Sequence, residues 1–224
     1  HTHKLDKREE LKRDIDSLVK QGVFYALVLN NFSSNAENNR EVLRHSKQLD
    51  VVYANGGITA TGQHPSFAYE RKISGIKEWW LPANTAKIKS SNKGENDAYW
   101  FMNTMEEVDK KWLAFLSTKP DLVKVYLLNV NKNANQDPKT LTENTIKYIA
   151  KKAKESELRV VAHIESFDDL KVGLRCGIRI FGHMPHYNVN FSKELPDEFQ
   201  FTNSETIIIK QFNPISIPPL SFNE

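Results

Sequence analysis

Residues 158–183, LRVVAHIESFDDLKVGLRCGIRIFGH, contain two short apolar runs, and each run ends in a histidine. His163 closes the first run and His183 closes the second. Between the runs, Ser166 and Asp169 have the spacing of a helix-capping box, and apolar residues follow at helical spacing. This order predicts a strand, a helix and a second strand parallel to the first. The stretch therefore predicts a parallel sheet with a histidine at the carboxyl end of two successive strands.

The same alternation of short apolar runs and helical patterns extends over the rest of the chain. The expected strands are residues 23–29, 51–54, 122–128, 158–163, 178–183 and 215–220. The expected helices are residues 6–21, 37–49, 97–117, 142–156 and 166–176, with a short one near 205–211. Residues 55–96 are rich in Gly, Ser, Asn and Lys, and this composition predicts a long irregular loop insertion.

Six expected strands lie inside the chain, and His1 is expected to close a seventh that is cut off just before it. This number of βα units favours an α/β fold of the TIM-type (β/α)8 barrel class. The barrel would be incomplete, because the eighth βα unit and the start of the first strand are missing. On this interpretation residues 1–224 form a single, partial catalytic barrel domain with a loop insertion at about 55–96. A doubly wound open sheet is the competing architecture, although no glycine-rich phosphate loop follows any expected strand.

The composition is that of a chain with a sizeable core, since 39% of its 224 residues are hydrophobic. Its 31 Lys and Arg and 28 Asp and Glu residues are interspersed, which gives little support for a nucleic-acid partner. The lysines between Lys147 and Lys154 are interpreted as the solvated face of a helix. Cys176 is the single cysteine, so no internal disulfide can form. No apolar run reaches the length of a membrane span, and the localisation stays open.

The chain begins with His1-Thr2-His3. Residues two apart in a strand project to the same side, so His1 and His3 can bind one cation together. A single histidine at a strand end is more often a core residue than a ligand. Together with His163 and His183, however, this pair predicts a metal site. Zinc is the expected cofactor, as one or two divalent ions.

Lys124 lies within the apolar strand expected at 122–128. A barrel strand is covered on both faces, so a lysine inside it must be paired, neutralised or modified. The alternative is a lysine at a strand end that pairs with a carboxylate. Tyr126 is on the same face of the strand, and we expect it either to contact a substrate or to be a core tyrosine. His64 lies on a loop, where it either contacts a substrate carbonyl or is a surface histidine.

These residues and their order resemble the amidohydrolase superfamily, especially its imidazolonepropionase-like and prolidase-like members. The similarity is carried by His1-Thr-His3, by Lys124 in DLVKVY, by His163 in VAHI and by His183 in FGHMP. It extends to a glycine-rich loop that ends in His-Pro, matched here by residues 56–65. Each motif is weak alone, but the set in this order is specific.

The resemblance implies a metal-dependent hydrolase of an amide-type C–N bond in a small-molecule substrate. By this resemblance, His1 and His3 bind one metal ion and His163 and His183 bind the other. Lys124, as a carbamate, bridges the two ions. The metal-activated hydroxide would attack a carbonyl carbon. This chemistry suits peptide bonds, cyclic amides and related compounds alike.

The family also uses an aspartate at the end of the eighth strand, and no such strand follows Leu220. We therefore expect the chain to be a fragment of a longer enzyme. The alternative is a catalytically incomplete barrel that acts as a binding or scaffold protein. A transport or interaction protein with an open α/β sheet is a further class, and it predicts no metal.

Overall fold

Short apolar runs form parallel strands in the computed structural model, which describes residues 2, 5–46, 48–130, 140–183 and 207–208. The strands assigned there are β1 (Tyr25–Val28), β2 (Asp50–Tyr53), β3 (Gly57–Thr59), β4 (Tyr99–Phe101), β5 (Val123–Leu127), β6 (Val160–Ile164), β7 (Ile180–Phe181) and β8 (Ile207–Ile208). β1 pairs with β2, and the others form a six-stranded sheet in the order β4-β3-β5-β6-β7-β8. All of these pairs are parallel. Neighbouring strands in each sheet therefore present their carboxyl ends at the same edge.

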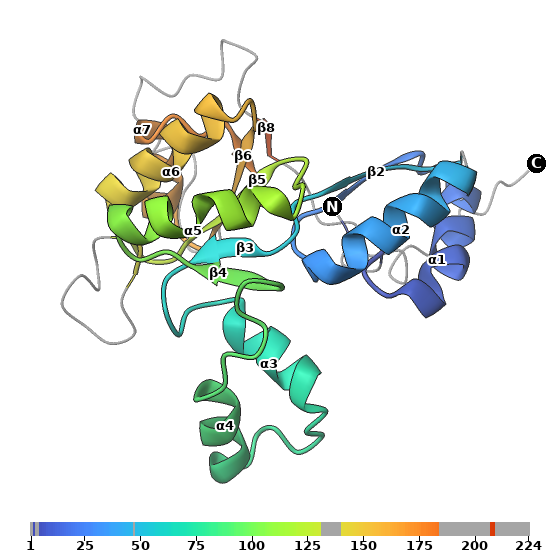
Figure 1. Cartoon of the computed structure of the whole chain (residues 1–224), viewed down its shortest axis with the longest axis horizontal. Coiled ribbons are helices and arrows are strands. Elements are labelled where there is room, and N and C mark those ends of the chain that lie inside the picture. Colours follow the sequence, from blue (N-terminus) through green and yellow to red (C-terminus); the bar gives the residue numbers. More distant parts are fainter. Residues whose placement is uncertain (1, 3–4, 47, 131–139, 184–206, 209–224) are drawn as a thin grey trace, which may run out of the picture.

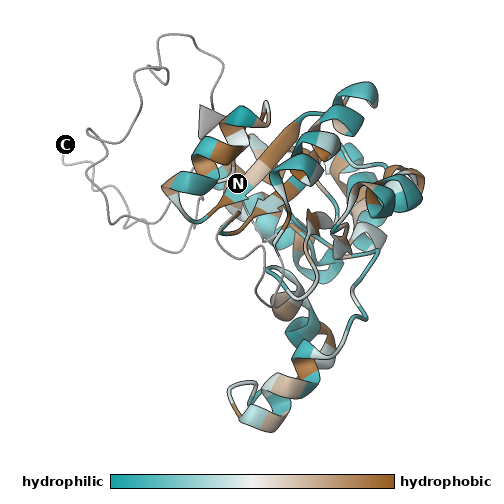
Figure 2. Ribbon diagram, turned by 90° about the vertical axis from the view of Figure 1, so that its left-hand side faces the viewer, coloured by the Kyte–Doolittle hydropathy of each residue, from teal (hydrophilic) through white to brown (hydrophobic). Residues whose placement is uncertain are grey.

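Helices connect the strands and cover the sheets. They are α1 (Arg8–Lys20), α2 (Ser33–Ser46), α3 (Ser66–Ser74), α4 (Pro82–Lys89), α5 (Met105–Ser117), α6 (Glu143–Glu155) and α7 (Phe167–Arg175). Figure 1 shows α5, α6 and α7 beside the six-stranded sheet, α1 and α2 on the side of β2, and α3 and α4 as a pair that projects away from both sheets. Figure 2 shows helices with both teal and brown segments, as expected of helices that bury one face.

The main core lies between the six-stranded sheet and its helices. α6 buries Ile146, Ile149 and Ala153, which recur at helical spacing on one face. These residues join the same core as Val125 and Leu127 of β5. Fully burying such an aliphatic side chain contributes about 1.5–3 kcal/mol. The packing of α6 against β5 therefore fixes the position of the strands whose ends form this edge of the sheet.

The chain bends sharply between β2 and β3, which are separated by only three residues but belong to different sheets. Asn55 within this bend has a positive φ of 59°. The backbone N–H of Asn31 donates to the Asn55 carbonyl at 3.2 Å, and the Asn31 side-chain oxygen accepts from the Asn55 N–H at 3.0 Å. This reciprocal pair stabilises a conformation that is unfavourable for most residues.

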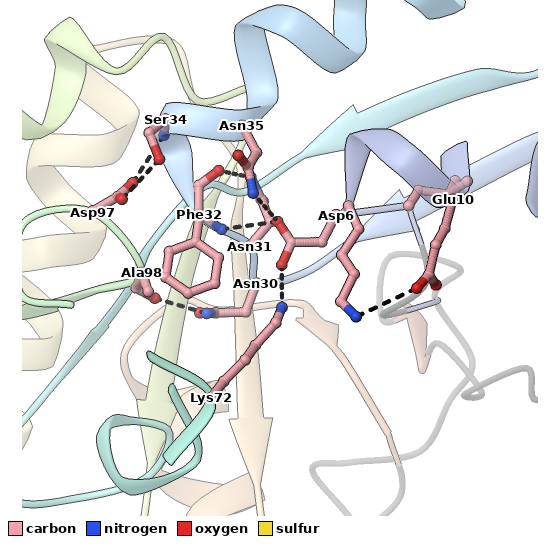
Figure 3. Close-up of polar contacts among 12 residues, drawn as sticks. Asp6, Glu10, Asn30, Asn31, Phe32, Ser34, Asn35, Lys72, Asp97 and Ala98 are labelled. Atoms are coloured by element: carbon pink, nitrogen blue, oxygen red, sulfur yellow. Dashed lines mark hydrogen bonds and ion pairs between the residues drawn. The ribbon is translucent and has the colours of Figure 1, made fainter. Parts of the chain in front are cut away.

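Asn30, at the end of the β1 segment, ties three parts of the chain together. Its Oδ1 accepts from the Gly57 N–H at 2.8 Å, and its Nδ2 donates to the Ala98 carbonyl at 2.8 Å. Figure 3 shows the contact with Ala98 close to a second polar link, in which the buried Asp6 carboxylate accepts from Lys72 Nζ at 2.7 Å. The Asn30 side chain therefore links the segment after β1 to the first residue of β3 and to the residue before β4.

The predicted capping box at the start of α7 is confirmed. Asp169 N–H donates to Ser166 Oγ at 3.2 Å, and Ser166 N–H donates to Asp169 Oδ2 at 3.0 Å. The buried Asp169 also accepts from the Val130 N–H at 3.1 Å through Oδ1. One carboxylate thus caps α7 and joins it to the segment that follows β5.

The irregular insertion predicted for residues 55–96 is wrong, because β3, α3 and α4 lie within it. β3 has only three residues, too few to show a strand pattern. α3 and α4 expose most of their residues, so no stripe of apolar side chains marks them as helices. Composition alone therefore gave a misleading prediction here.

Two other predicted elements differ from the structure. The helix predicted for residues 97–117 begins too early, because the buried aromatic strand β4 precedes α5 and Thr104 caps that helix by accepting from the Glu107 N–H at 3.2 Å. The short helix predicted near 205–211 is also wrong at residues 207–208, where a β-branched run forms β8. The strand predicted for 215–220 lies outside the described residues.

The α/β class with parallel sheets is confirmed. The strands of the described residues form two parallel sheets and no closed one, so the closed barrel stays a prediction. No helix among the described residues combines the length and the apolar character needed to cross a membrane.

Candidate active site

Three aromatic side chains meet at the carboxyl ends of β5, β6 and β7. Tyr126 in β5 is the register partner of His163 in β6, and their ring centroids are 5.0 Å apart. His183 follows β7 by two residues, and its Nε2 lies 2.7 Å from His163 Nδ1. The two imidazole ring centroids are 4.4 Å apart. The structure thus brings together the two strand-end histidines and Tyr126.

His64 approaches the same cluster from the loop between β3 and α3. Its ring stacks on His163 with centroids 5.1 Å apart, and it lies 5.2 Å from the Tyr126 ring. Thr59 Oγ1 donates to the His64 carbonyl at 2.7 Å and so holds the loop. His64 is exposed to solvent while its ring contacts the cluster, and the contact with a substrate stays a prediction.

Lys124 is almost fully buried, with 3% of its surface exposed. Its Nζ lies 5.5 Å from the Tyr126 ring centroid, and none of the carboxylates in the described part of the chain forms an ion pair with it. The alternative of a lysine paired with a carboxylate is therefore not found among these residues. Burial lowers the pKa of Lys124 to about 7, because the charged form loses its hydration. A substantial share of this amine is neutral at physiological pH.

Burial acts in the opposite direction on Tyr126. It raises the pKa of Tyr126 well above its ordinary value, with a smaller contribution from Tyr69. The Tyr126 hydroxyl consequently stays protonated and can donate a hydrogen bond. Glu165 lies near the cluster, with Oε1 3.7 Å from His163 Nε2, and would form an ion pair with a protonated His163.

Two glycines make room for these side chains. A Cβ at Gly57 would lie 2.5 Å from both Asn30 Oδ1 and Tyr126 Cε2. A Cβ at Gly182 would lie 2.6 Å from Lys124 Nζ. The backbone can therefore approach Tyr126 at Gly57 and Lys124 at Gly182 only because glycine has no side chain.

We expect Gly57→Ala to destabilise the protein by about 1–3 kcal/mol, because the added methyl group clashes with Asn30 and Tyr126. Urea-induced unfolding measures this loss, and the near-UV circular dichroism spectrum should change as the tyrosine ring moves. Gly22→Ala is the control: its φ is +76° and a Cβ there would meet nothing within 4 Å. The control should lose stability through backbone strain but keep the spectrum. A Gly57→Ala variant with parental stability and spectrum would contradict the crowding.

The structure leaves His1 and His3 outside the described residues. Thr2 between them is buried, and its N–H donates to the Leu27 carbonyl of β1 at 2.9 Å. The start of the chain at Thr2 therefore lies beside β1. Asn30 is the residue that sequence reasoning missed: it contacts both Gly57 and Ala98, and only its position directly after an apolar run could have indicated it.

The cluster of His163, His183, Tyr126 and Lys124 contains nitrogen atoms of the kind that bind metal cations. Two imidazole rings converge at the ends of adjacent strands, where their facing nitrogens share a hydrogen bond, and a partly neutral amine lies in the same part of the sheet. Imidazole nitrogen is a common ligand of zinc. Within the described ranges, no three His, Cys, Asp or Glu side chains form a group that could hold a metal ion by themselves.

Comparison with solved structures finds chains that share this fold. The chain superimposes on A. niger ochratoxinase with a TM-score of 0.55 at 14% identity, covering 80% of this chain and 41% of that one. A Xaa-Pro dipeptidase with bound methionine gives a TM-score of 0.54 at 14% identity, covering 80% and 42%. An amidohydrolase gives 0.53 at 14% identity, covering 75% and 39%.

No protein-family model and no curated protein matches this chain. At this level of identity, the likeness to solved structures shows a shared fold. The chain spans about two fifths of the length of these solved chains, at 41%, 42% and 39%. The likeness therefore shows that this chain shares its fold with a part of each of these solved structures.

Proposed function

We propose that this protein carries part of the active site of a metal-dependent hydrolase that cleaves an amide-type C–N bond. The observation that carries the proposal is the convergence of His163 and His183, with 2.7 Å between two ring nitrogens, at the end of a parallel sheet. Two of the structural neighbours bear the names dipeptidase and amidohydrolase, which denote enzymes that hydrolyse such bonds. These neighbours support the reaction class.

His163 and His183 are the residues that would hold one zinc ion, and His1 and His3 are proposed as the ligands of a second. Lys124 is suited to join the two sites, because its neutral amine is the form that can add carbon dioxide and release a proton to become a carbamate. Bound zinc would supply a water of lowered pKa and would polarise the substrate carbonyl.

The other residues of the site would bind and orient the substrate. Tyr126 keeps its proton at neutral pH, so its hydroxyl can donate to a carbonyl or carboxylate oxygen. His64 lies at the solvent side of the cluster and would contact the substrate as it enters. Selectivity would then depend on the loops that follow the strands.

Zinc content and amide hydrolysis, measured on the same purified protein, test this proposal. We expect bound zinc in stoichiometric amount and hydrolysis of members of a panel of dipeptides, N-acyl amino acids and cyclic amides. Removal of zinc by a chelator should abolish hydrolysis, and added zinc should restore it. Zinc binding without turnover is the result expected of the alternative, a barrel that acts as a binding or scaffold protein. A protein that retains no zinc and hydrolyses none of the panel would contradict the metal-dependent mechanism.

A further inference from the structure

A groove of about 870 Å³ opens at the amino-terminal ends of β6 and β7, away from the candidate active site. It lies between the carboxyl-terminal parts of α6 and α7, and its volume is within the range of small-molecule sites. Among the described residues that line it, the ionisable side chains other than the thiol of Cys176 are all cationic: Lys147, Lys151, Lys154, Arg159, Arg175 and Arg179. We call this feature the cationic groove.

The concentration of positive charge in the cationic groove is local. The whole chain has 31 basic and 28 acidic residues, whereas none of the described residues that line this groove is acidic. Half of the cations have carboxylate partners: Lys147 and Arg175 pair with the partly buried Glu143 at 3.0 and 2.9 Å, and Lys151 pairs with the exposed Glu155 at 3.8 Å. In the described part of the chain Lys154, Arg159 and Arg179 form no ion pair with a carboxylate. The groove therefore keeps excess positive charge that its own neighbours do not neutralise.

Helix ends explain only part of this charge. A cation at the carboxyl end of a helix is stabilised by the unpaired carbonyls there. Arg179 fits this explanation, because its Nη1 donates to the Leu174 carbonyl of α7 at 2.9 Å. Arg159 does not, because it directly precedes β6, and Lys147 lies two turns before the end of α6. Positively charged side chains from α6, from α7 and from the residue before β6 therefore line the same groove.

We propose that the cationic groove binds a compact polyphosphate anion, such as a di- or triphosphate group. Closely spaced lysines and arginines match several phosphate oxygens at once, and arginine can bind them with two parallel hydrogen bonds. No aromatic side chain of the described residues lines the groove, so it lacks the stacking platform of single-stranded nucleic-acid sites. The size of the groove and this lining favour a small anion over a nucleic acid.

This site is separate from the proposed hydrolytic centre. Arg159 precedes His163 by four residues of extended chain, which corresponds to about 13 Å along β6. Binding in the cationic groove can therefore be measured in protein that has no metal and no activity. The two proposals can fail independently of one another.

Isothermal titration of zinc-free protein with sodium tripolyphosphate tests the site. We expect binding that weakens steeply as potassium chloride is raised from low concentration to about 0.15 M, because the attraction is between charges. The double variant Lys154→Ala/Arg159→Ala should raise the Kd at least tenfold. Both residues are exposed, so circular dichroism should show an unchanged fold.

A matched double variant, Lys12→Ala/Lys20→Ala, removes two exposed charges from α1 and should leave the Kd unchanged. Equal weakening in both double variants would overturn the proposal, because it would show a response to net charge alone. Absence of heat and of binding at low salt would overturn it as well. A single-stranded oligonucleotide that binds the groove more tightly than tripolyphosphate would overturn the assignment to a compact anion.

Discussion

His163→Ala is expected to lower kcat/KM for amide hydrolysis at least about a thousandfold and to release zinc from the protein. The reason is the position of His163 between its neighbours: its Nδ1 faces His183 Nε2 at 2.7 Å, and its ring contacts both His64 and Tyr126. Loss of a metal ligand removes several kcal/mol of transition-state stabilisation, and each 1.4 kcal/mol corresponds to about a tenfold change in rate. Zinc analysis after gel filtration and steady-state kinetics measure the two effects.

His45→Ala is the matched control for this substitution. His45 lies on the exposed surface of α2, where its Nδ1 is 2.7 Å from the Glu41 carbonyl, and it contacts none of the site residues that the structure describes. We expect this variant to keep its zinc and its activity. If His163→Ala kept full activity, or if both variants lost zinc equally, the assignment of His163 as a ligand would be wrong. Circular dichroism of both variants checks that the fold is retained.

Lys124→Met is expected to stabilise the zinc-free protein at pH 7 by about 4 kcal/mol and to abolish hydrolysis. The folded state lowers the pKa of Lys124 from 10.5 to about 7, because burial removes the hydration of the ammonium group. At about 1.4 kcal/mol per pKa unit, this difference corresponds to a few kcal/mol. Methionine fills a similar volume without a charge. Urea unfolding in buffer free of metal and carbon dioxide measures the stability, and amide hydrolysis with added zinc measures the function.

The pH dependence of this stabilisation follows from the direction of the pKa change. Between pH 7 and 10.5 the unfolded chain binds more protons at Lys124 than the folded protein does, so the stability of the parent rises with pH over this range. The cost of burying Lys124 is fully present below pH 7 and has disappeared above pH 10.5. The difference between Lys124→Met and the parent should therefore shrink across this range.

Lys20→Met provides the control, because Lys20 is exposed in the last turn of α1. This variant should differ little from the parent in stability at any pH between 7 and 10.5. A Lys124→Met protein that is no more stable than the parent at pH 7, or whose advantage does not change with pH, would contradict the burial of a titrating amine. Full hydrolysis by Lys124→Met with added zinc would contradict its role in the site.

Local sequence patterns predicted the helices and strands whose own residues show a recognisable spacing. The capping box of Ser166 and Asp169 and the short apolar runs before His163 and His183 mark β6, α7 and β7, and the structure contains all three. β3 and β4 carry no such signal, because three buried residues show neither strand alternation nor helical spacing. Their place in the sheet depends on pairing with each other and, for β3, with β5.

The proximity of His163, His183 and Tyr126 could be predicted from the sequence, because parallel strands bring their carboxyl ends to one edge and residues at strand ends become neighbours. The contact of His64 with His163 could not be recognised, because it depends on the path of a loop. The same is true of Asn30, whose hydrogen bond to Gly57 spans 27 residues. Short-range spacing determines which side chains a strand presents at its end. Pairing between distant segments determines which of them meet, since those contacts form only when the whole sheet is assembled.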